Sequence, residues 1–129
     1  MVQQDLSGMR FLITEDNLLC ADILAELLRL RHASVSCVHS GEEAVRRIGE
    51  AGEEYDAVLM DVQMPGMNGY EATRAIRALT CGAKVPVFAM TASMQESDRH
   101  SAQLAGMNAF LHKPLEMAML DQALACISA

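Results

Sequence analysis

The sequence predicts an α/β domain in which a five-stranded parallel sheet lies between two layers of helices. Five short apolar runs alternate with five segments of helical periodicity along the chain. Short strands that are apolar throughout are typical of a parallel sheet with both faces covered. With 129 residues, 51% of them hydrophobic, the chain suits one domain with a full core. We therefore expect a (βα)5 three-layer sandwich that occupies residues 1–129.

The first two strands and helices are predicted in the first third of the chain. Arg10–Thr14 is the first apolar run, and Ser34–Val38, with apolar residues at alternate positions, is the second. Ser40 and Glu43 have the spacing of a capping box at the start of the second helix. The first helix is predicted by an apolar stripe at i, i+3, i+4 and i+7, made of Cys20, Ile23, Leu24 and Leu27.

The remaining strands and helices follow in the same alternation. Ala57–Met60 is a third apolar strand, Val85–Met90 a fourth and Ala109–His112 a fifth. A polar helix between the last two strands covers roughly Gln95–Ala105 and ends at Gly106, a residue typical of helix C-termini. Two further helical stripes consist of Ala72, Ala75, Ile76 and Leu79, and of Leu120, Ala123, Leu124 and Ile127.

The charge balance excludes several classes of function. The formal net charge is -7 and only two residues are lysines, so no basic surface is available for nucleic acid. No apolar run approaches the roughly 18 residues of a membrane span, and residues 1–8 are too polar for a secretory signal. We expect a cytoplasmic domain without membrane or direct nucleic-acid contacts, and a flexible N-terminal segment at residues 1–8.

The spacing of the cysteines and histidines predicts no metal site. The four cysteines are scattered, without a pair or a Cys/His cluster at zinc-ligand spacing. We expect reduced thiols, and we expect the four histidines to be surface or structural residues.

A set of polar residues follows the predicted strands at the points where the strands end. In open parallel sheets, ligands bind beyond the carboxyl ends of the strands. These residues therefore come from distant segments to one crevice: Glu15, Asp16, Asp61, Thr91 and Lys113.

The chemistry of this set indicates phosphoryl transfer to a carboxylate. Each pair of like charges about 4 Å apart costs on the order of 4 kcal/mol, so three carboxylates need a cation. Oxygen ligands beside a phosphoryl group suit Mg²⁺. Lys113 supplies a fixed positive charge for an anion, and the Thr91 hydroxyl is a hydrogen-bond donor. Transfer to an aspartate requires little beyond positioning and charge neutralisation.

Four motifs in order resemble the response-regulator receiver domain of two-component signalling. They are "FLITEDN", "LMDVQMPGMNG", "VPVFAMTA" and "AFLHKPL", and the resemblance runs from about Met9 to Ala125. The segments "GYEATRAIR" and "AGMNAFLHKPL" are most similar to receivers attached to hybrid histidine kinases. The resemblance implies a flavodoxin-like fold.

The resemblance also implies a role for each strand-end residue. Asp61 is the expected phosphoacceptor, taking a phosphoryl group from the phosphohistidine of a histidine kinase or a histidine phosphotransfer protein. Asp16, Asp61 and the backbone carbonyl of Gln63 are the expected Mg²⁺ ligands, and Glu15 acts through water. Thr91 and Lys113 hold the phosphoryl oxygens, and a cis peptide before Pro114 aims the lysine inward.

A conformational switch is part of the same expectation. Phe110 occupies the aromatic switch position, three residues before Lys113. On phosphorylation Thr91 would move toward the new anion, and the ring of Phe110 would turn inward. The surface around the fourth helix, the fifth strand and the last helix would then change for a downstream protein or attached domain, which the sequence does not identify. Such coupling is usually worth about 1 to 3 kcal/mol.

Some positions depart from the commonest family pattern. Glu15 stands where many members have Asp, and we expect metal binding to survive the extra methylene. Phe110 lacks the hydroxyl of the frequent Tyr, which puts in doubt any switch that uses that hydroxyl. Gln63 and Ser93, each two residues after a site residue, are expected to tune the lifetime of the phosphate.

Two alternative functions are weighed against the signalling switch, which we do not expect to be an enzyme beyond slow self-dephosphorylation. A Mg²⁺-dependent phosphohydrolase would also form an aspartyl phosphate, but it typically carries a second aspartate where this chain has Gln63. A receiver used only for docking is the other alternative. The presence of all five strand-end residues argues against it.

Overall fold

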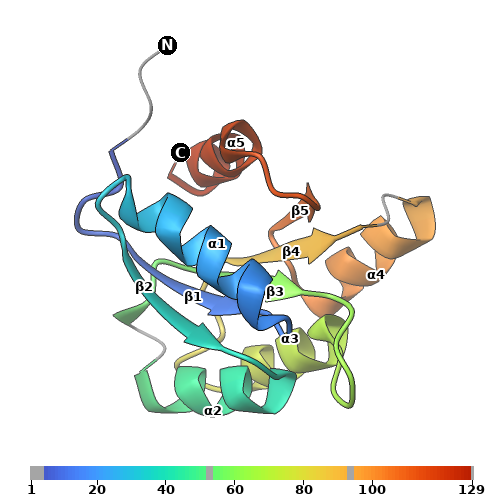
Figure 1. Ribbon diagram of the computed structural model, residues 1–129. Helices are drawn as coiled ribbons and strands as arrows, with labels where there is room; N and C mark the ends of the chain where they lie inside the picture. Colours follow the sequence, from blue (N-terminus) through green and yellow to red (C-terminus); the bar gives the residue numbers. More distant parts are fainter. Residues whose placement is uncertain (1–4, 52–53, 93–94, 129) are drawn as a thin grey trace.

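The computed structural model describes residues 5–51, 54–92 and 95–128. Five strands alternate with five helices, and all neighbouring strands are parallel in the order β2-β1-β3-β4-β5, which confirms the predicted fold class (Figure 1). The elements are β1 Arg10–Thr14, α1 Leu18–Arg29, β2 Ser34–Val38, α2 Gly41–Ala51, β3 Ala57–Asp61, α3 Gly69–Ala78, β4 Val87–Thr91, α4 Glu96–Ala105, β5 Ala109–His112 and α5 Met117–Ser128.

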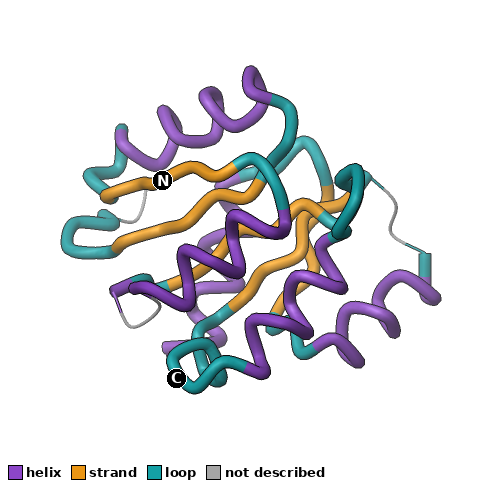
Figure 2. Tube along the Cα trace, turned by 90° about the horizontal axis from the view of Figure 1, so that it is seen from below, coloured by secondary structure: helices purple, strands orange, loops and turns teal. Residues whose placement is uncertain are grey.

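Helices cover both faces of the sheet. Figure 2 shows this arrangement in a view turned by 90° from that of Figure 1. The first core cluster joins α1 and α5 to one face, and the second joins α2, α3 and α4 to the other. Successive strand residues alternate between the clusters: Leu59 of β3 lies in the first, whereas Val58 and Met60 lie in the second. Because both faces are covered, β3 and β4 are buried at every position.

The buried face of α1 differs from the predicted stripe. Of the predicted residues only Leu24 is buried, whereas Cys20, Ile23 and Leu27 are exposed. The helix turns its two alanines toward the sheet together with leucines, because small side chains allow the backbone to approach closely. Apolar residues cover most of the circumference of α1 and leave one charged stripe, Asp22, Glu26 and Arg29, so periodicity alone could not identify the buried face. The residues that α1 buries are Ala21, Leu24, Ala25 and Leu28.

One predicted strand start requires adjustment, whereas two predicted helix ends are confirmed. β4 begins at Val87 rather than Val85, because Pro86 has no N–H group for the ladder, although its carbonyl accepts from the N–H of Val58 at 2.8 Å. The Ser40 hydroxyl accepts from the N–H of Glu43 at 3.1 Å, as expected for a helix cap. Gly106 ends α4 in the left-handed conformation, with φ 97°, as predicted.

The N-terminal segment expected to be flexible is described from Asp5 onward. Leu6 is fully buried in the first core cluster, and its N–H donates to the carbonyl of Arg31 at 2.8 Å. The part of the segment around Leu6 is therefore packed against the domain. Arg31 in turn makes a bidentate ion pair with Asp121 of α5, which ties the end of α1 to the last helix.

Arg77 of α3 connects three segments on the opposite face of the sheet. Its guanidinium donates to neutral oxygens. Most of them are backbone carbonyls outside the helices and strands, for which the guanidinium takes the place of a backbone N–H donor. The acceptors are the backbone carbonyls of Gly82, Val85 and Gly106, at 2.9, 2.6 and 2.8 Å, and the side-chain oxygen of Asn108 at 2.8 Å. This arginine therefore fixes the loop before β4 and the end of α4 to α3.

Replacing Arg77 with Met is expected to lower the free energy of unfolding by about 2 to 4 kcal/mol, because several partly buried carbonyls lose their donor. Urea denaturation followed by circular dichroism measures this difference. Arg74→Met is the matched control, since Arg74 is an exposed residue of the same helix. Equal effects of the two substitutions would contradict the role given to Arg77.

Candidate functional site

Four of the five strands bring polar residues to one end of the sheet. The chain passes from β1 to β2 on one side and then returns to β3 on the other side of β1. Glu15 and Asp16 directly follow β1, and Asp61 is the last residue of the neighbouring strand β3. Thr91 ends β4, and Lys113 follows β5. All five predicted strand-end residues therefore meet at the carboxyl edge.

The three acidic residues form a compact cluster. One carboxylate oxygen from each of Glu15, Asp16 and Asp61 lies within 4.8 Å of the others. Glu15 and Asp61 are each only 3% exposed, whereas Asp16 is exposed. Two buried carboxylates this close repel each other strongly unless a cation lies between them.

Lys113 supplies one cation to this cluster. Its Nζ lies 2.9 Å from Oε2 of Glu15 and 3.1 Å from Oδ2 of Asp61. Its backbone N–H donates to the carbonyl of Thr91 at 2.7 Å, which holds the start of the β5–α5 loop against β4. The peptide bond between Lys113 and Pro114 is cis, as the resemblance implied.

The ionisation of the cluster shows that one lysine does not neutralise it. The pKa of Glu15 is raised to about 7, first because burial disfavours the charged carboxylate and then because Asp61 lies against it. Lys113 opposes this rise only in part. Burial lowers the pKa of Lys113, but the hydrogen bonds and charges of the two carboxylates outweigh it, so that its pKa is raised. The cluster therefore has room for a further positive charge.

This donor set fits Mg²⁺. Hard divalent cations prefer oxygen ligands, and Mg²⁺ retains several waters when it binds to one or two carboxylates. Asp16 and Asp61 are the residues that would hold the ion, with Glu15 close enough to act through water. When bound, Mg²⁺ would neutralise negative charge on a phosphoryl group at this site.

The loop after β3 keeps Asp61 at the crevice. Oδ1 of Asp61 accepts a hydrogen bond from the N–H of Gln63 at 3.1 Å, and the N–H of Gly69 donates to the carbonyl of Val62 at 3.2 Å. At position 69 a Cβ atom would collide with the carbonyl oxygen of Asp61. Asn68 then begins α3 with a complete capping box to Glu71, a pattern that the sequence analysis missed.

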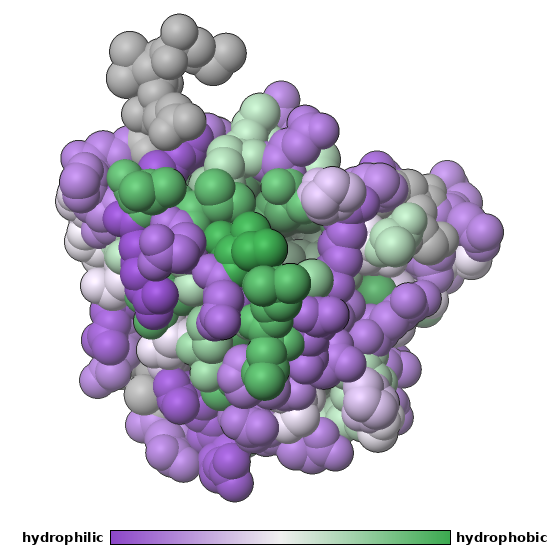
Figure 3. Space-filling view, viewed as in Figure 1, coloured by the Kyte–Doolittle hydropathy of each residue, from purple (hydrophilic) through white to green (hydrophobic). Residues whose placement is uncertain are grey.

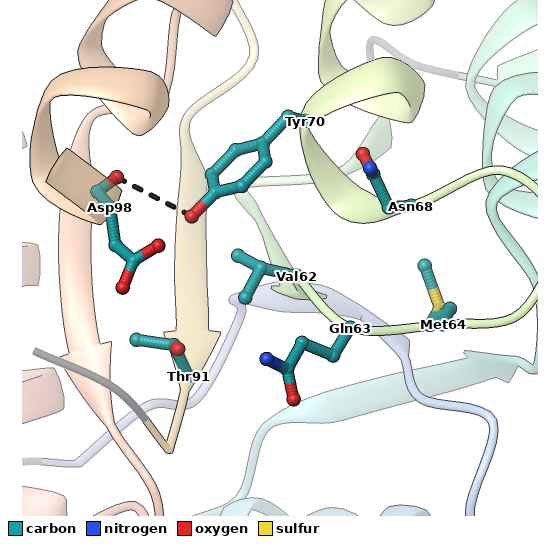
Figure 4. A pocket seen from close by; sticks show the side chains of 7 residues that line it. All are labelled: Val62, Gln63, Met64, Asn68, Tyr70, Thr91 and Asp98. Atoms are coloured by element: carbon teal, nitrogen blue, oxygen red, sulfur yellow. Dashed lines mark hydrogen bonds between the residues drawn. The ribbon is translucent and has the colours of Figure 1, made fainter.

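A cavity of about 430 Å³ lies on the α4 side of Asp61 (Figure 4). Thr91 and Gln63 point into it from neighbouring segments, and Thr91 is 2% exposed. Across the cavity, the hydroxyl of Tyr70 donates to the backbone carbonyl of Asp98 at 3.4 Å. The cavity provides space beside the Thr91 hydroxyl. Ser93, the other position expected to tune phosphate lifetime, lies outside the described residues.

Phe110, the expected switch residue, lies on β5 and packs partly buried against the second core cluster. Ala89 of β4 pairs with Phe110, so Thr91, two residues further along β4, projects from the same face of the sheet. The guanidinium of Arg99 lies over the Phe110 ring, 5.6 Å from its centroid. The sequence analysis did not identify this contact.

One histidine contacts the backbone beside the acidic cluster. Nδ1 of His39 lies 3.0 Å from the carbonyl oxygen of Glu15, so this histidine supports the backbone beside the acidic cluster. His39 directly follows β2, and its place at a strand end was the signal that could have revealed the contact. All four cysteines are free thiols.

An apolar groove of about 470 Å³ borders the acidic cluster on its α1 side. Glu15 and Lys113 contribute to its wall together with Ile23 and Leu27 of α1. Figure 3 shows the hydrophobic side chains that gather on this side of the molecule. Leu18, which starts α1, is 61% exposed, and Ile23 is 54% exposed. Ile23 and Leu27 belong to the apolar stripe that predicted this helix, and their exposure was not expected from that stripe.

The fold and the site define a receiver domain with an acidic cluster that fits a metal ion. A profile of the response regulator receiver domain family matches residues 11–125. The chain belongs to this family, as the motifs indicated.

Two curated relatives are histidine kinases. The chain is 34% identical over 140 residues to probable histidine kinase 5 of Oryza sativa subsp. japonica, covering 93% of this chain and 12% of the relative. It is 32% identical over 126 residues to hybrid signal transduction histidine kinase L of Dictyostelium discoideum, covering 93% of this chain and 7% of the relative. The chain thus spans only a small part of these relatives. The match to a hybrid histidine kinase confirms the predicted likeness to receivers of hybrid kinases.

A solved structure supports the metal assignment. The receiver domain of sensor histidine kinase PA1611 from Pseudomonas aeruginosa PAO1 is 39% identical, with a TM-score of 0.84, and the match covers 95% of this chain and 100% of that chain. That structure has a magnesium ion coordinated in the active site cleft. Among the residues described for the present chain, no helix is long and apolar enough to cross a membrane.

The affinity for Mg²⁺ is expected to fall by up to about tenfold from pH 8 to pH 6. Glu15 has a pKa of about 7. At a pH below this value it carries a proton that must be released when the ion binds, and at a higher pH the carboxylate is already charged. Isothermal titration calorimetry measures this dependence. Glu15→Gln should bind Mg²⁺ more weakly but with little change across the same range. An equally steep dependence in Glu15→Gln would assign the proton to another group.

Proposed function

We propose that Asp61 accepts a phosphoryl group from a phosphohistidine in a Mg²⁺-dependent reaction, and that this phosphorylation changes the surface around α4, β5 and α5. The observation that carries the proposal is the position of Asp61, whose carboxylate lies beside those of Glu15 and Asp16 and 3.1 Å from the Lys113 ammonium. The surface change acts on a downstream protein or on an attached domain of a longer chain.

The transfer step uses few protein groups. An oxygen of Asp61 forms a bond to phosphorus while the bond from phosphorus to the imidazole nitrogen of the donor breaks, and the electron pair stays on the imidazole. Nζ of Lys113 contacts Oδ2 of Asp61, so the ammonium can pair with a phosphoryl oxygen. The Thr91 hydroxyl can donate to a second oxygen from the cavity side. Both groups stabilise charge on the transferring group, which is the main requirement of this chemistry.

The same geometry favours a switch over a hydrolase. The residue two positions after Asp61 is Gln63, whose exposed amide side chain cannot serve as a general acid or base. Its backbone carbonyl is the proposed third protein ligand of the metal. Hydrolysis of the aspartyl phosphate then depends on water alone, which agrees with a signal that persists until slow self-dephosphorylation removes it.

The donor is proposed to be the histidine-bearing helix of a kinase or of a histidine phosphotransfer protein, docked on the exposed face of α1. A donor imidazole that reaches Asp61 must place its carrier over the rim of the crevice. On the α1 side this rim is apolar, and its groove shares Glu15 and Lys113 with the acidic cluster. Such a donor obtains its phosphoryl group from ATP, so the proposed location is the cytoplasm.

Incubation with Mg²⁺ and acetyl phosphate is expected to add the mass of one phosphoryl group to the protein. Intact mass spectrometry measures the adduct, and Asp61→Asn should abolish it because the amide is a poor nucleophile. Asp56→Asn, at the opposite end of the same strand, is the matched control and should retain it. An adduct on Asp61→Asn would refute the acceptor assignment. Absence of any adduct on the unaltered protein would favour a docking role.

Ile23→Glu is expected to reduce phosphorylation by protein donors at least tenfold, because a charge on the apolar rim opposes docking. Transfer from a panel of purified, phosphorylated histidine phosphotransfer proteins measures this rate. Acetyl phosphate should still label the variant, which separates docking from chemistry. Leu104→Glu is the matched control, since Leu104 is 70% exposed on α4. Equal losses in the two variants would contradict the docking face.

A further inference from the structure

Two aromatic side chains contact consecutive residues in the first half of α4. Tyr70 of α3 donates its hydroxyl to the carbonyl of Asp98 across the cavity beside Thr91 (Figure 4). The ring of Phe110 from β5 lies under the guanidinium of Arg99, 5.6 Å from centroid to carbon. The start of α4 is therefore joined to the two neighbouring elements through one residue each.

The contact between Arg99 and Phe110 is the main interaction of this guanidinium. Arg99 is exposed, and no hydrogen bond or ion pair within the described parts of the chain involves its guanidinium. Phe110 is only partly buried, so one face of its ring is covered from outside by the cation. At an exposed site such a pair changes an equilibrium about two- to fivefold.

Phe110 and the cavity beside Thr91 lie on the same side of β4 and β5. Phe110 and Thr91 project from the same face of the sheet, and the residue paired with Phe110 is Ala89, whose side chain is a single methyl group. The cavity beside Thr91 lies on that face. If the ring turns in this direction and away from the guanidinium of Arg99, the cation–π contact breaks.

We propose that Arg99 is a positioning residue that holds the Phe110 ring in its outer orientation and thereby opposes the switched state. This inference rests on the proposed function, in which phosphorylation of Asp61 draws Thr91 toward the anion. Arg99 reduces the fraction of molecules that are switched before phosphorylation. By thermodynamic linkage, it weakens the binding of any phosphoryl mimic by the same factor.

The direction of the effect distinguishes this role from ordinary electrostatics. Removal of a positive charge near the site lowers its affinity for an anion. If Arg99 holds the ring outward, its removal instead raises that affinity, because the switched state becomes easier to reach. An increase in affinity therefore identifies the positioning role.

The test is equilibrium binding of beryllofluoride, a phosphoryl mimic, in saturating Mg²⁺ to the full chain. Arg99→Gln is expected to bind about two- to fivefold more tightly than the unaltered protein. In its ligand-free form, the NMR signals of the ¹³C-labelled Phe110 ring should shift toward their positions in the beryllofluoride complex. Arg99→Lys keeps a cation and should lie near the unaltered protein in both measurements.

Arg10→Gln is the matched control, because it removes a similar cation from the ring of Tyr55 at the opposite end of the sheet, where the separation is 5.9 Å. Its affinity for beryllofluoride should not change. Unchanged or weaker binding by Arg99→Gln, or an equal gain in Arg99→Gln and Arg99→Lys, would overturn the inference. If the unaltered protein neither binds beryllofluoride nor gains a phosphoryl group, the proposed function itself fails, which is a separate result.

Discussion

The ion pairs of Lys113 with Glu15 and Asp61 are the interaction on which the rest of the site depends. Both carboxylates are almost completely buried, and burial of unpaired charge is costly. The ammonium at 2.9 and 3.1 Å makes this arrangement tolerable, although burial and the neighbouring Asp61 keep the pKa of Glu15 raised. The affinity for a second cation is therefore a direct consequence of the buried charges.

The order of the strands makes this arrangement possible. β1 and β3 are neighbours, so the acidic residues after β1 lie beside Asp61. β4 and β5 continue the sheet on the far side of β3 and bring Thr91 and Lys113 to the same edge. A carboxylate, a hydroxyl and an ammonium thus surround one point, although the residues are far apart in the chain. The helices on both faces bury the central strands β3 and β4 at every position.

The two sides of the crevice have different chemical character, which suits two different uses. On the α1 side, exposed apolar residues continue from the acidic cluster into a groove. On the α4 side, the cavity beside Thr91 is lined by polar groups such as Gln63 and Asp98. An apolar rim is suited to a protein that delivers a phosphoryl group, and a cavity beside Thr91 leaves room for the rearrangement that follows. Delivery and response can therefore act on one aspartate from opposite sides.

The local sequence predicted the alternation of strands and helices and the polar residues that follow the strands. This information is local: apolar runs, helical periodicity and the polar residue that ends each run are encoded within a few neighbouring positions. Packing against the sheet decided which face of α1 is buried, because apolar residues cover most of the circumference of that helix and contact with the sheet selects Ala21 and Ala25. The tertiary structure also decided the contacts of Lys113 with Glu15 and of Arg99 with Phe110. These pairs come from different elements, and their distances depend on how the whole chain packs.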